Sequence, residues 1–417
     1  MKPASNERFW LIIMGLFYLG GRLPSAAAWE VKVSLRPEQT GVQVPVRVEL
    51  SPQQAAAVPG GWQLVDLAAP EAPPLPAQVS TPGEAKPRWL SFLLYSEPAT
   101  GPATHRFRLV HSDAPAPPVF QFRDLGAGRL ELSENGQPVL VYNYGMQLAG
   151  GVPERYRRAD YLHPLYDLDG TVLTDDFPRD HLHHRGLSWT WPQVKVGEKT
   201  YDLWALQGIG QRFEKWLVRE VGPVYALLGV QSGWYVGEER VVEETVRLRV
   251  FRAGPVGRAI DVELTLEAAD RLVLLRGRPP HKGYGGLTLR FAPRKDPVVH
   301  TSEGRLKGDA VQKRFLWSDY SARFGAGKRI SGAAIFDHPE NPNHPPGWLN
   351  RYYGILNPTW PGLEWATLEP GRPVHLFYRV WIHRGGVEAG RVAAAFAAFV
   401  HPPQVQVQPP RKGLILP

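Results

Sequence analysis

The sequence of 417 residues predicts an all-β protein of sandwich or barrel architecture. Short stretches alternate between apolar and other residues, as in residues 30–35, 43–50 and 245–250, and this period of two is typical of strands with one buried face. Glycine and proline make up about a fifth of the chain and fall between these stretches as turn signals. Helical periodicity is best developed in Val387–Phe399, so we expect many short strands and one late helix.

The first 28 residues have the features of a secretory signal peptide. Lys2 and Arg8 give a positive start, Phe9–Leu19 form an apolar run, and Ala26–Ala28 provide small residues at a cleavage point. The apolar run is shorter than the roughly 20 residues that a membrane-spanning helix needs. We therefore expect a secreted or periplasmic protein with no integral membrane domain after cleavage, and an uncleaved anchor is the alternative.

The composition argues against several classes of site and partner. The chain has no cysteine, which excludes disulfides and thiolate metal sites and suits a bacterial periplasm or cell surface. The formal net charge is +8, and the arginines are scattered rather than gathered into the basic stripe that nucleic-acid binding needs. An acidic ligand such as a uronate-containing glycan is compatible with this charge but is not required by it.

The distribution of proline predicts the domain boundaries. Residues 113–118 are proline-rich and have the character of a stiff, exposed linker. They would separate a small N-terminal β domain, residues 29–112, from a large domain, residues 119–401. The first has about the size of a small β-sandwich. Residues 402–417 contain four further prolines after Pro402 and little to pack, so we expect a peripheral or disordered tail.

The densest polar segment of the chain is Asp180–Gly186, which contains His181, His183 and His184. An imidazole can serve as acid, base or metal ligand near neutral pH. If the segment is extended, His181 and His183 share one face and could bind zinc with ligands from elsewhere. The alternative is a loop whose histidines satisfy backbone groups and stack on nearby tryptophans. Polar chemistry beside aromatic residues favours a pocket, with a bound divalent metal left open and no cofactor assigned.

A second candidate is Glu244, which lies within the alternating stretch Val241–Val250. The alternation places its carboxylate on the same side as Val242 and Val246. A carboxylate in apolar surroundings has a raised pKa unless it is paired, and this suits general acid or base catalysis. The alternative is a position at the rim of the strand or in a structural ion pair.

Two further segments have the composition of binding loops. Glycines follow Lys282 and would let the backbone approach a ligand closely, although a hairpin turn with an incidental lysine explains them equally well. The long irregular stretch 336–354 is uncommon in a compact domain unless it is functional. In it, Trp348 and Tyr352 could stack on a sugar ring. The 14 tryptophans of the chain are compatible with a carbohydrate platform but equally with a β-sandwich core.

The segment Asp180–Gly186, preceded by Tyr161–Tyr166 and followed by Lys282–Leu287 and Ile335–Pro342, resembles the PmoA-like family of exported bacterial proteins. The resemblance covers about residues 120–400, and Leu182 stands where the family motif has proline. It implies a galactose-mutarotase-like β-supersandwich, a fold shared by sugar epimerases, polysaccharide lyases and several glycosidases. The family label is borrowed from a methane oxygenase subunit that is embedded in the membrane by helices, and the mature chain offers no such helices.

These observations lead to one hypothesis and two alternatives. We expect an exported carbohydrate-active protein, a lyase, epimerase or hydrolase that acts on a glycan or sugar derivative. A non-catalytic glycan-binding module is the first alternative, and a metal-dependent oxygenase is the second. The expected acid–base residues are His183, His184, Glu244 and Lys282. The expected substrate-binding residues are Arg158, His181, Arg185, Trp189, Tyr284, Asp337, Asn341, Trp348 and Arg351.

Overall fold

The computed structural model describes residues 29–51, 61–80, 88–112, 116–327 and 329–408. The predicted signal peptide (1–28), half of the predicted linker (113–115) and the last part of the predicted tail (409–417) lie outside these ranges. The described chain is built from β-strands, with short 3-10 helices at Pro37–Gln39 (η1) and Glu154–Tyr156 (η2) and one α-helix. The predicted all-β class, a supersandwich preceded by a small β domain, is confirmed.

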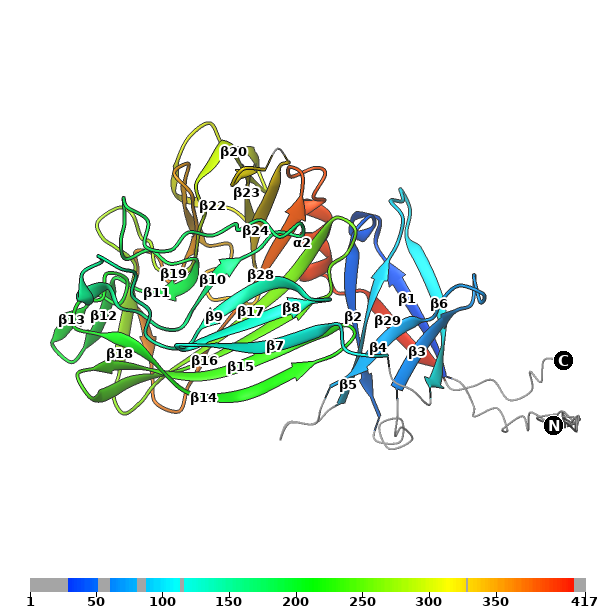
Figure 1. Cartoon of the computed structure of the whole chain (residues 1–417), viewed down its shortest axis with the longest axis horizontal. Helices are drawn as coiled ribbons and strands as arrows, with labels where there is room; N and C mark the ends of the chain where they lie inside the picture. The colour runs from blue at the N-terminus through cyan, green and yellow to red at the C-terminus, as the bar shows by residue number, and fades with distance from the viewer. Residues whose placement is uncertain (1–28, 52–60, 81–87, 113–115, 328, 409–417) are drawn as a thin grey trace, which may run out of the picture.

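The small domain is one antiparallel sheet of seven strands that bends around its own core (Figure 1). Its order is β2-β5-β4-β3-β6-β1-β29. Alternate residues of the strands point inward, so Val31 and Val33 of β1 meet Val46 and Val48 of β2 in a shared core. The strands are β1 (Trp29–Leu35), β2 (Gln43–Leu50), β3 (Gly61–Asp66), β4 (Leu75–Val79), β5 (Arg88–Tyr95), β6 (Ala103–Ser112) and β29 (Gln404–Gln408).

For the tail, a peripheral or a disordered segment was expected, and residues 404–408 form an ordered strand at the edge of the small domain. In β29, Val405 pairs with Val33 and Val407 pairs with Val31, so the strand forms the edge of the small domain. Both of its valines pack against the core of that domain. Residues 404–408 therefore belong structurally to the domain at the other end of the chain.

The large domain consists of two nine-stranded sheets and one four-stranded sheet, all antiparallel (Figure 1). In sheet order, the first nine-stranded sheet contains β22 (Ala310–Arg314), β25 (Gly347–Arg351), β26 (Ile355–Thr359), β19 (Gly286–Arg290), β11 (Leu187–Thr190), β10 (Tyr161–Leu165), β9 (Gln137–Asn143), β8 (Arg129–Glu134) and β7 (Phe120–Gly126). The second contains β14 (Gly210–Val221), β15 (Tyr225–Val236), β16 (Glu239–Phe251), β17 (Gly257–Ala268), β28 (Val374–Arg384), β24 (Ser331–Asp337), β23 (Trp317–Phe324), β20 (Arg294–Thr301) and β21 (Gly304–Arg305). The small sheet contains β13 (Lys199–Tyr201), β12 (Gln193–Val196), β18 (Val273–Arg276) and β27 (Ala366–Leu368).

The two large sheets share one hydrophobic core. Val242, Val246 and Leu248 of β16 belong to the same buried cluster as Leu187 and Trp189 of β11 in the facing sheet. The alternation predicted for residues 241–250 is observed within β16, with the apolar side turned inward. This packing of sheet on sheet is the supersandwich.

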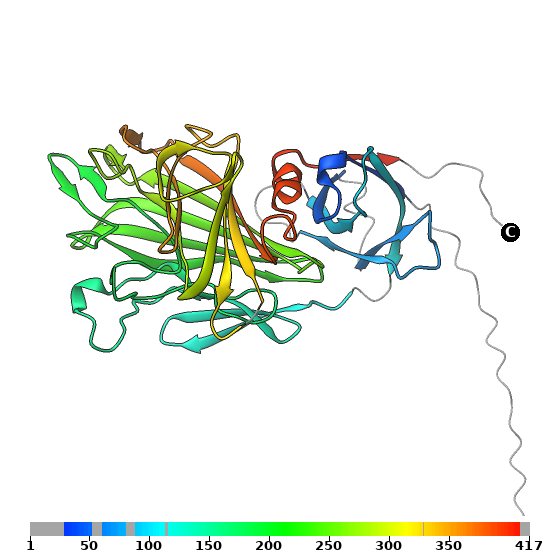
Figure 2. The same ribbon diagram turned by 90° about the horizontal axis from the view of Figure 1, so that it is seen from above.

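The helix α2 (Val392–Val400) lies between the two domains (Figure 2). It begins five residues later than the periodicity of Val387–Phe399 predicts, after Arg391 in the left-handed region (φ 51°). Its buried residues share a cluster with Val44 of the small domain and Tyr225 of the large domain. The contact buries apolar side chains from both sides, so the domains pack as one body. Among the described residues, no helix has the length and hydropathy that crossing a bilayer requires.

The packing of α2 gives a first prediction. Ala395 is 4% exposed at the contact between the domains, so Ala395→Glu would bury an unpaired carboxylate, at a cost of several kcal/mol. We expect a clearly lower midpoint in thermal or urea unfolding. Ala393 is exposed on the same helix, and Ala393→Glu should leave the midpoint nearly unchanged. Equal effects of the two substitutions would contradict this packing.

Candidate functional site

The histidine segment lies in the connection between β10 and β11, which are neighbours in the first large sheet. Its final residue, Gly186, passes so close to β10 that a Cβ there would lie 2.1 Å from the carbonyl oxygen of Leu162. Only glycine permits this approach. The sequence therefore fixes the end of the segment against the sheet, and this positions the histidines that precede it.

The histidines do not alternate along an extended strand. The amide of His181 donates to the carbonyl of Pro178 (3.0 Å) and that of His184 donates to the carbonyl of His181 (2.9 Å), so the backbone turns twice. As a result, the rings of His181 and His184 are stacked in parallel with centroids 4.4 Å apart. The ring of His183 stands perpendicular to both, at 5.8 and 4.6 Å.

Aromatic side chains from distant parts of the sequence enclose these rings. Tyr353 stacks on His181 with a centroid distance of 5.3 Å. Trp204 meets His184 edge-on at 5.6 Å, and Tyr284 lies 4.7 Å from Trp204. We call the three histidines with Tyr353, Trp204 and Tyr284 the histidine cluster. Sequence analysis missed Trp204 and Tyr353, because no local pattern connects these turns with residues 181–184.

Two buried arginines, both predicted to bind substrate, instead hold the backbone around the cluster. Arg185 is 1% exposed and donates to the carbonyls of Leu182 and His184 (2.8 Å each). Arg158 is 2% exposed and donates to the carbonyls of Leu203 and Trp204. Both side chains are almost fully buried and bond backbone carbonyls, which corrects their assignment to direct substrate contact; the Nε atom of each has no hydrogen-bond partner among the described residues. Burial, and then the charge of Arg185, lowers the pKa of Arg158 to about 9.

A third arginine, Arg290 at the end of β19, was not predicted as a site residue. It donates to Asp180 (2.7 Å), whose other oxygen lies 3.0 Å from Nδ1 of His181. Its guanidinium carbon lies 5.0 Å from the centroid of Tyr353. The Nε and Nη1 atoms of Arg290 are buried with no hydrogen-bond partner among the described residues. Arg290 thus links Asp180, His181 and Tyr353 and retains donors for a further group.

His183 is the member of the cluster best disposed to react. It is partly exposed and makes no hydrogen bond with another described residue. Burial, followed by the charge of Arg158, lowers the pKa of His183 to about 4. Stronger burial also lowers the pKa of His184, whose Nδ1 has no described partner. Both rings are neutral at pH 7, so one nitrogen of the His183 ring is unprotonated there.

Glu244 is remote from solvent. It is 0% exposed, and its carboxylate accepts from the indole nitrogens of Trp189 (2.8 Å) and Trp234 (2.7 Å) and from the amide of Gln211 (3.1 Å). Burial raises its pKa and the three donors oppose this effect. The predicted roles of Glu244 in catalysis and of Trp189 in sugar binding are therefore corrected, because both side chains belong to the core between the sheets.

The glycine turn places Lys282 in solvent and Tyr284 in the histidine cluster. A Cβ on Gly277 would lie 2.0 Å from the carbonyl oxygen of Gly283. The small residues of this turn therefore allow a contact of backbone with backbone. The ammonium of Lys282 makes no hydrogen bond or ion pair with the described residues. The backbone carbonyl of Lys282 accepts a hydrogen bond from the side chain of Gln312 (2.9 Å).

The prediction of one long irregular loop over residues 336–354 is wrong, because β24 continues to Asp337 and β25 occupies Gly347–Arg351. The shorter loop between these strands is fixed by its own polar residues. The side-chain amide of Asn341 donates to Asp337 and to the carbonyl of Phe377 (2.8 Å each). Asn341 and Asp337, both predicted to bind sugar, are at most 5% exposed. Their side chains are satisfied internally and form no binding rim, which corrects the prediction. The length of the loop was a poor guide to its role.

The other predicted residues of this stretch also have structural partners. Trp348 is 0% exposed and its indole donates to the carbonyl of Phe315 (2.8 Å), so it cannot stack on a sugar. Arg351 pairs with Asp309 at 2.9 Å. The member of the segment that reaches the histidine cluster is Tyr353.

The side chains around the cluster do not form a metal-binding set. Within the described ranges, no group of three or more His, Asp or Glu side chains is arranged to hold a metal ion. The spacing of His181 and His183 suggested a possible zinc site, but the described residues provide no ligand set for it. The facial set of ligands that an iron oxygenase needs is likewise not assembled from these residues.

Comparison with known proteins places the chain in a family. Residues 129–397 match the family of unknown function DUF6807, and this region is more than half of the chain. The chain belongs to this family. The matched region contains the histidine cluster and both large sheets apart from β7, and it ends within α2. No curated protein matches the chain.

The similar solved structures include three carbohydrate-related proteins. An α-mannosidase from Enterococcus faecalis V583 aligns at a TM-score of 0.41 and 10% identity, covering 94% of this chain and 47% of that chain. A glycosyl hydrolase family 38 protein from the same species aligns at a TM-score of 0.39 and 11% identity, covering 94% of this chain and 48% of that chain. A polysaccharide lyase aligns at a TM-score of 0.24 and 15% identity, covering 66% of this chain and 33% of that chain. The chain spans about half the length of the first two, and scores this low carry no information about chemistry.

The lowered pKa of His183 gives a prediction for stability. A histidine of ordinary pKa near 6.5 in the unfolded chain takes up its proton before the folded His183 does, so stability is lost as pH falls from about 6.5 towards 4. Urea titrations across this range should show a smaller loss for His183→Gln than for the unmodified protein. The exposed His401 provides the control, since His401→Gln should retain the full loss. Identical pH profiles for all three proteins would contradict the lowered pKa of His183.

Proposed function

We propose that this protein is an exported carbohydrate-active enzyme that removes a proton from an acidic sugar, with His183 as the base. The observation that carries the proposal is the state of His183, a neutral, partly exposed imidazole without a hydrogen-bond partner. A base that works at neutral pH must be unprotonated and within reach of substrate. We retain as part of the proposal the export signal in residues 1–28 and the kinship with PmoA-like proteins.

The surroundings of His183 favour a uronate over a neutral sugar. Arg158 and Arg185 place positive charge close enough to depress the pKa of His183, and Arg290 keeps two donors without a described partner. Removing the proton next to a uronate carboxylate builds up negative charge, which fixed cations stabilise. Lys282, two residues from Tyr284 and exposed, supplies a further cation at the edge of the cluster.

The aromatic residues supply the binding surface. Tyr353 is 39% exposed and Tyr284 is partly exposed, so both rings can contact a sugar, while Trp204 packs against Tyr284 and His181 packs against Tyr353. His181 and His184 act as positioning residues, because their parallel stack holds the turn that carries His183. The contacts of Asp180 with His181 and Arg290 also help to position this turn.

Among the three reactions considered, proton abstraction fits better than hydrolysis. Glycosidases ordinarily use two carboxyl groups on opposite sides of the scissile bond. Glu244 is sequestered in the core, and Asp180 is engaged by Arg290 and His181. The side chains that remain suit β-elimination or epimerisation at the carbon next to a uronate carboxylate.

The test is a screen of the purified protein against polygalacturonate, alginate and glycosaminoglycans. Ultraviolet absorbance would report an unsaturated uronate, and incorporation of solvent deuterium would report epimerisation. We expect turnover with one of these substrates and a loss of about 10²–10⁴-fold in His183→Ala with the fold retained. The matched control is His401→Ala, which should retain full turnover.

Two outcomes would contradict the proposal. Unchanged turnover in His183→Ala would remove this residue from the mechanism. Saturable binding detected by thermal shift, with no product from any substrate, would favour a glycan-binding module, because the aromatic rings of the cluster could serve binding alone.

A further inference from the structure

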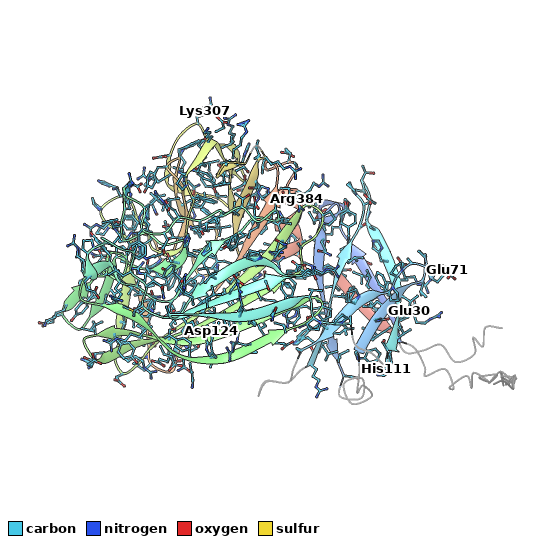
Figure 3. The ribbon with its side chains drawn as sticks, viewed as in Figure 1. Glu30, Glu71, His111, Asp124, Lys307 and Arg384 are labelled. Atoms are coloured by element: carbon cyan, nitrogen blue, oxygen red, sulfur yellow. The ribbon has the colours of Figure 1, made fainter. Side chains whose placement is uncertain are left out.

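The open side of the supersandwich lies between two edge strands. β7 ends the first large sheet and β14 ends the second, and both run along the lower side of the large domain in Figure 1. The sheets are joined at one end, where the amide of Val119 donates to the carbonyl of Gly222 (3.2 Å). Beside this junction is a pocket of about 760 Å³. The labelled Asp124 of β7 marks this side of the molecule in Figure 3.

A cluster of aromatic side chains lies along the same edges. Tyr144, Phe213 and Trp216 are all partly exposed, and their ring centroids lie 4.7–5.1 Å apart. The hydroxyl of Tyr144 donates to Asp124 (2.9 Å), which fixes the orientation of the ring. The guanidinium carbon of Arg219 lies 5.5 Å from the centroid of Trp216. Arg219 also lines the pocket, so the rings and the pocket form one continuous surface, here called the edge groove.

Several polar groups of the edge groove make no hydrogen bond with the described residues. Arg219 is exposed and makes no hydrogen bond or ion pair with the described residues, but it lies close enough to Asp124 to contribute, after the hydrogen bonds from Gly126 and Tyr144, to the lowered pKa of that carboxyl. The side-chain amides of Gln121 and Asn135, which line the pocket, also make no hydrogen bond within the described chain. The indole N–H of Trp216 is likewise without a described acceptor. In contrast, Arg158 and Arg185 beside the histidine cluster are buried and bond backbone carbonyls.

We infer that the edge groove is a second binding site, which takes an acidic oligosaccharide chain. Aromatic rings present flat apolar faces to the C–H faces of sugars, amides bond hydroxyl groups, and a free guanidinium binds a carboxylate or sulfate through paired hydrogen bonds. The eight-residue step from Phe213 to Val221 covers roughly 26 Å of strand. This length suits a chain of several sugars better than a single unit. The site shares no residue with the histidine cluster and does not depend on the chemistry proposed for His183.

A peptide strand is the competing occupant, since unpaired edges can accept one. The edges carry exposed charges that oppose strand addition, namely Arg212, Lys215 and Arg219 on β14 and Arg123 and Asp124 on β7. Exposed charged residues are a common means by which edge strands avoid pairing. The charge pattern and the aromatic cluster together favour a glycan.

The test is affinity electrophoresis of the full protein in gels containing polygalacturonate, alginate, hyaluronan or the neutral polymer hydroxyethylcellulose. We expect retardation by at least one of the acidic polymers and none by the neutral one. Trp216→Ala and Arg219→Gln should each weaken the binding at least tenfold. Leu217 is exposed and points to the other side of β14, so Leu217→Ala should bind normally. His183→Ala should also bind normally, even if it abolishes turnover.

Several outcomes would overturn this inference. They are no retardation by any acidic polymer, equal retardation by the neutral one, unchanged binding in Arg219→Gln, or loss of binding in His183→Ala. The last would assign the binding to the histidine cluster. Because Trp216 packs partly against the core, its variant needs a circular dichroism spectrum like that of the unmodified protein. Arg219→Gln changes an exposed side chain and decides the question if Trp216→Ala fails to fold.

Discussion

The arrangement of the large domain depends on the hydrogen bonds to the carboxylate of Glu244, which is buried between the two large sheets. Its partners come from both sheets, with Trp189 on β11 of one and Trp234 and Gln211 on β15 and β14 of the other. A carboxylate without such donors would be costly at 0% exposure. Because β11 directly follows the histidine segment, the same contact that sets the spacing of the sheets also anchors the turns that carry His181–His184.

A second buried carboxylate, Asp160, has fewer hydrogen-bond donors around it than Glu244. It is also fully buried, but its hydrogen bond from Tyr142 is longer (3.2 Å) and its second oxygen has no described partner. Burial, and then the charge of Glu244, raises the pKa of Asp160 well above its usual value. Burial raises the pKa of Glu244 as well, but there the hydrogen bonds from Trp189, Trp234 and Gln211 oppose the shift.

Sequence reasoning succeeded where a local period determines structure. The boundaries of β2 match the predicted stretch 43–50, and the alternation around Glu244 correctly placed its side chain on the apolar side. What alternation cannot reveal is the partner across the core, so the same buried position was interpreted as catalytic. Four of the six residues of the histidine cluster were predicted; Trp204 and Tyr353 were missed because they join it from distant turns, and so was Arg290, which lies beside it at the end of β19. The prediction of sugar ligands around Asp337 was wrong for a related reason. In a sequence, polar side chains that hydrogen-bond within a loop cannot be told from those that bind a ligand.

The pairing of β29 with β1 has a consequence for biosynthesis. The small domain is encoded at both ends of the chain, and its edge strand leaves the ribosome only after the entire large domain. Until then the outer edge of β1 presents unpaired amides and carbonyls, which is the kind of surface through which nascent chains associate wrongly. The region matched by the family ends at residue 397, before β29 and within α2. Expression of that region alone would therefore remove the whole small domain, β7, and the end of the helix on which the two domains meet.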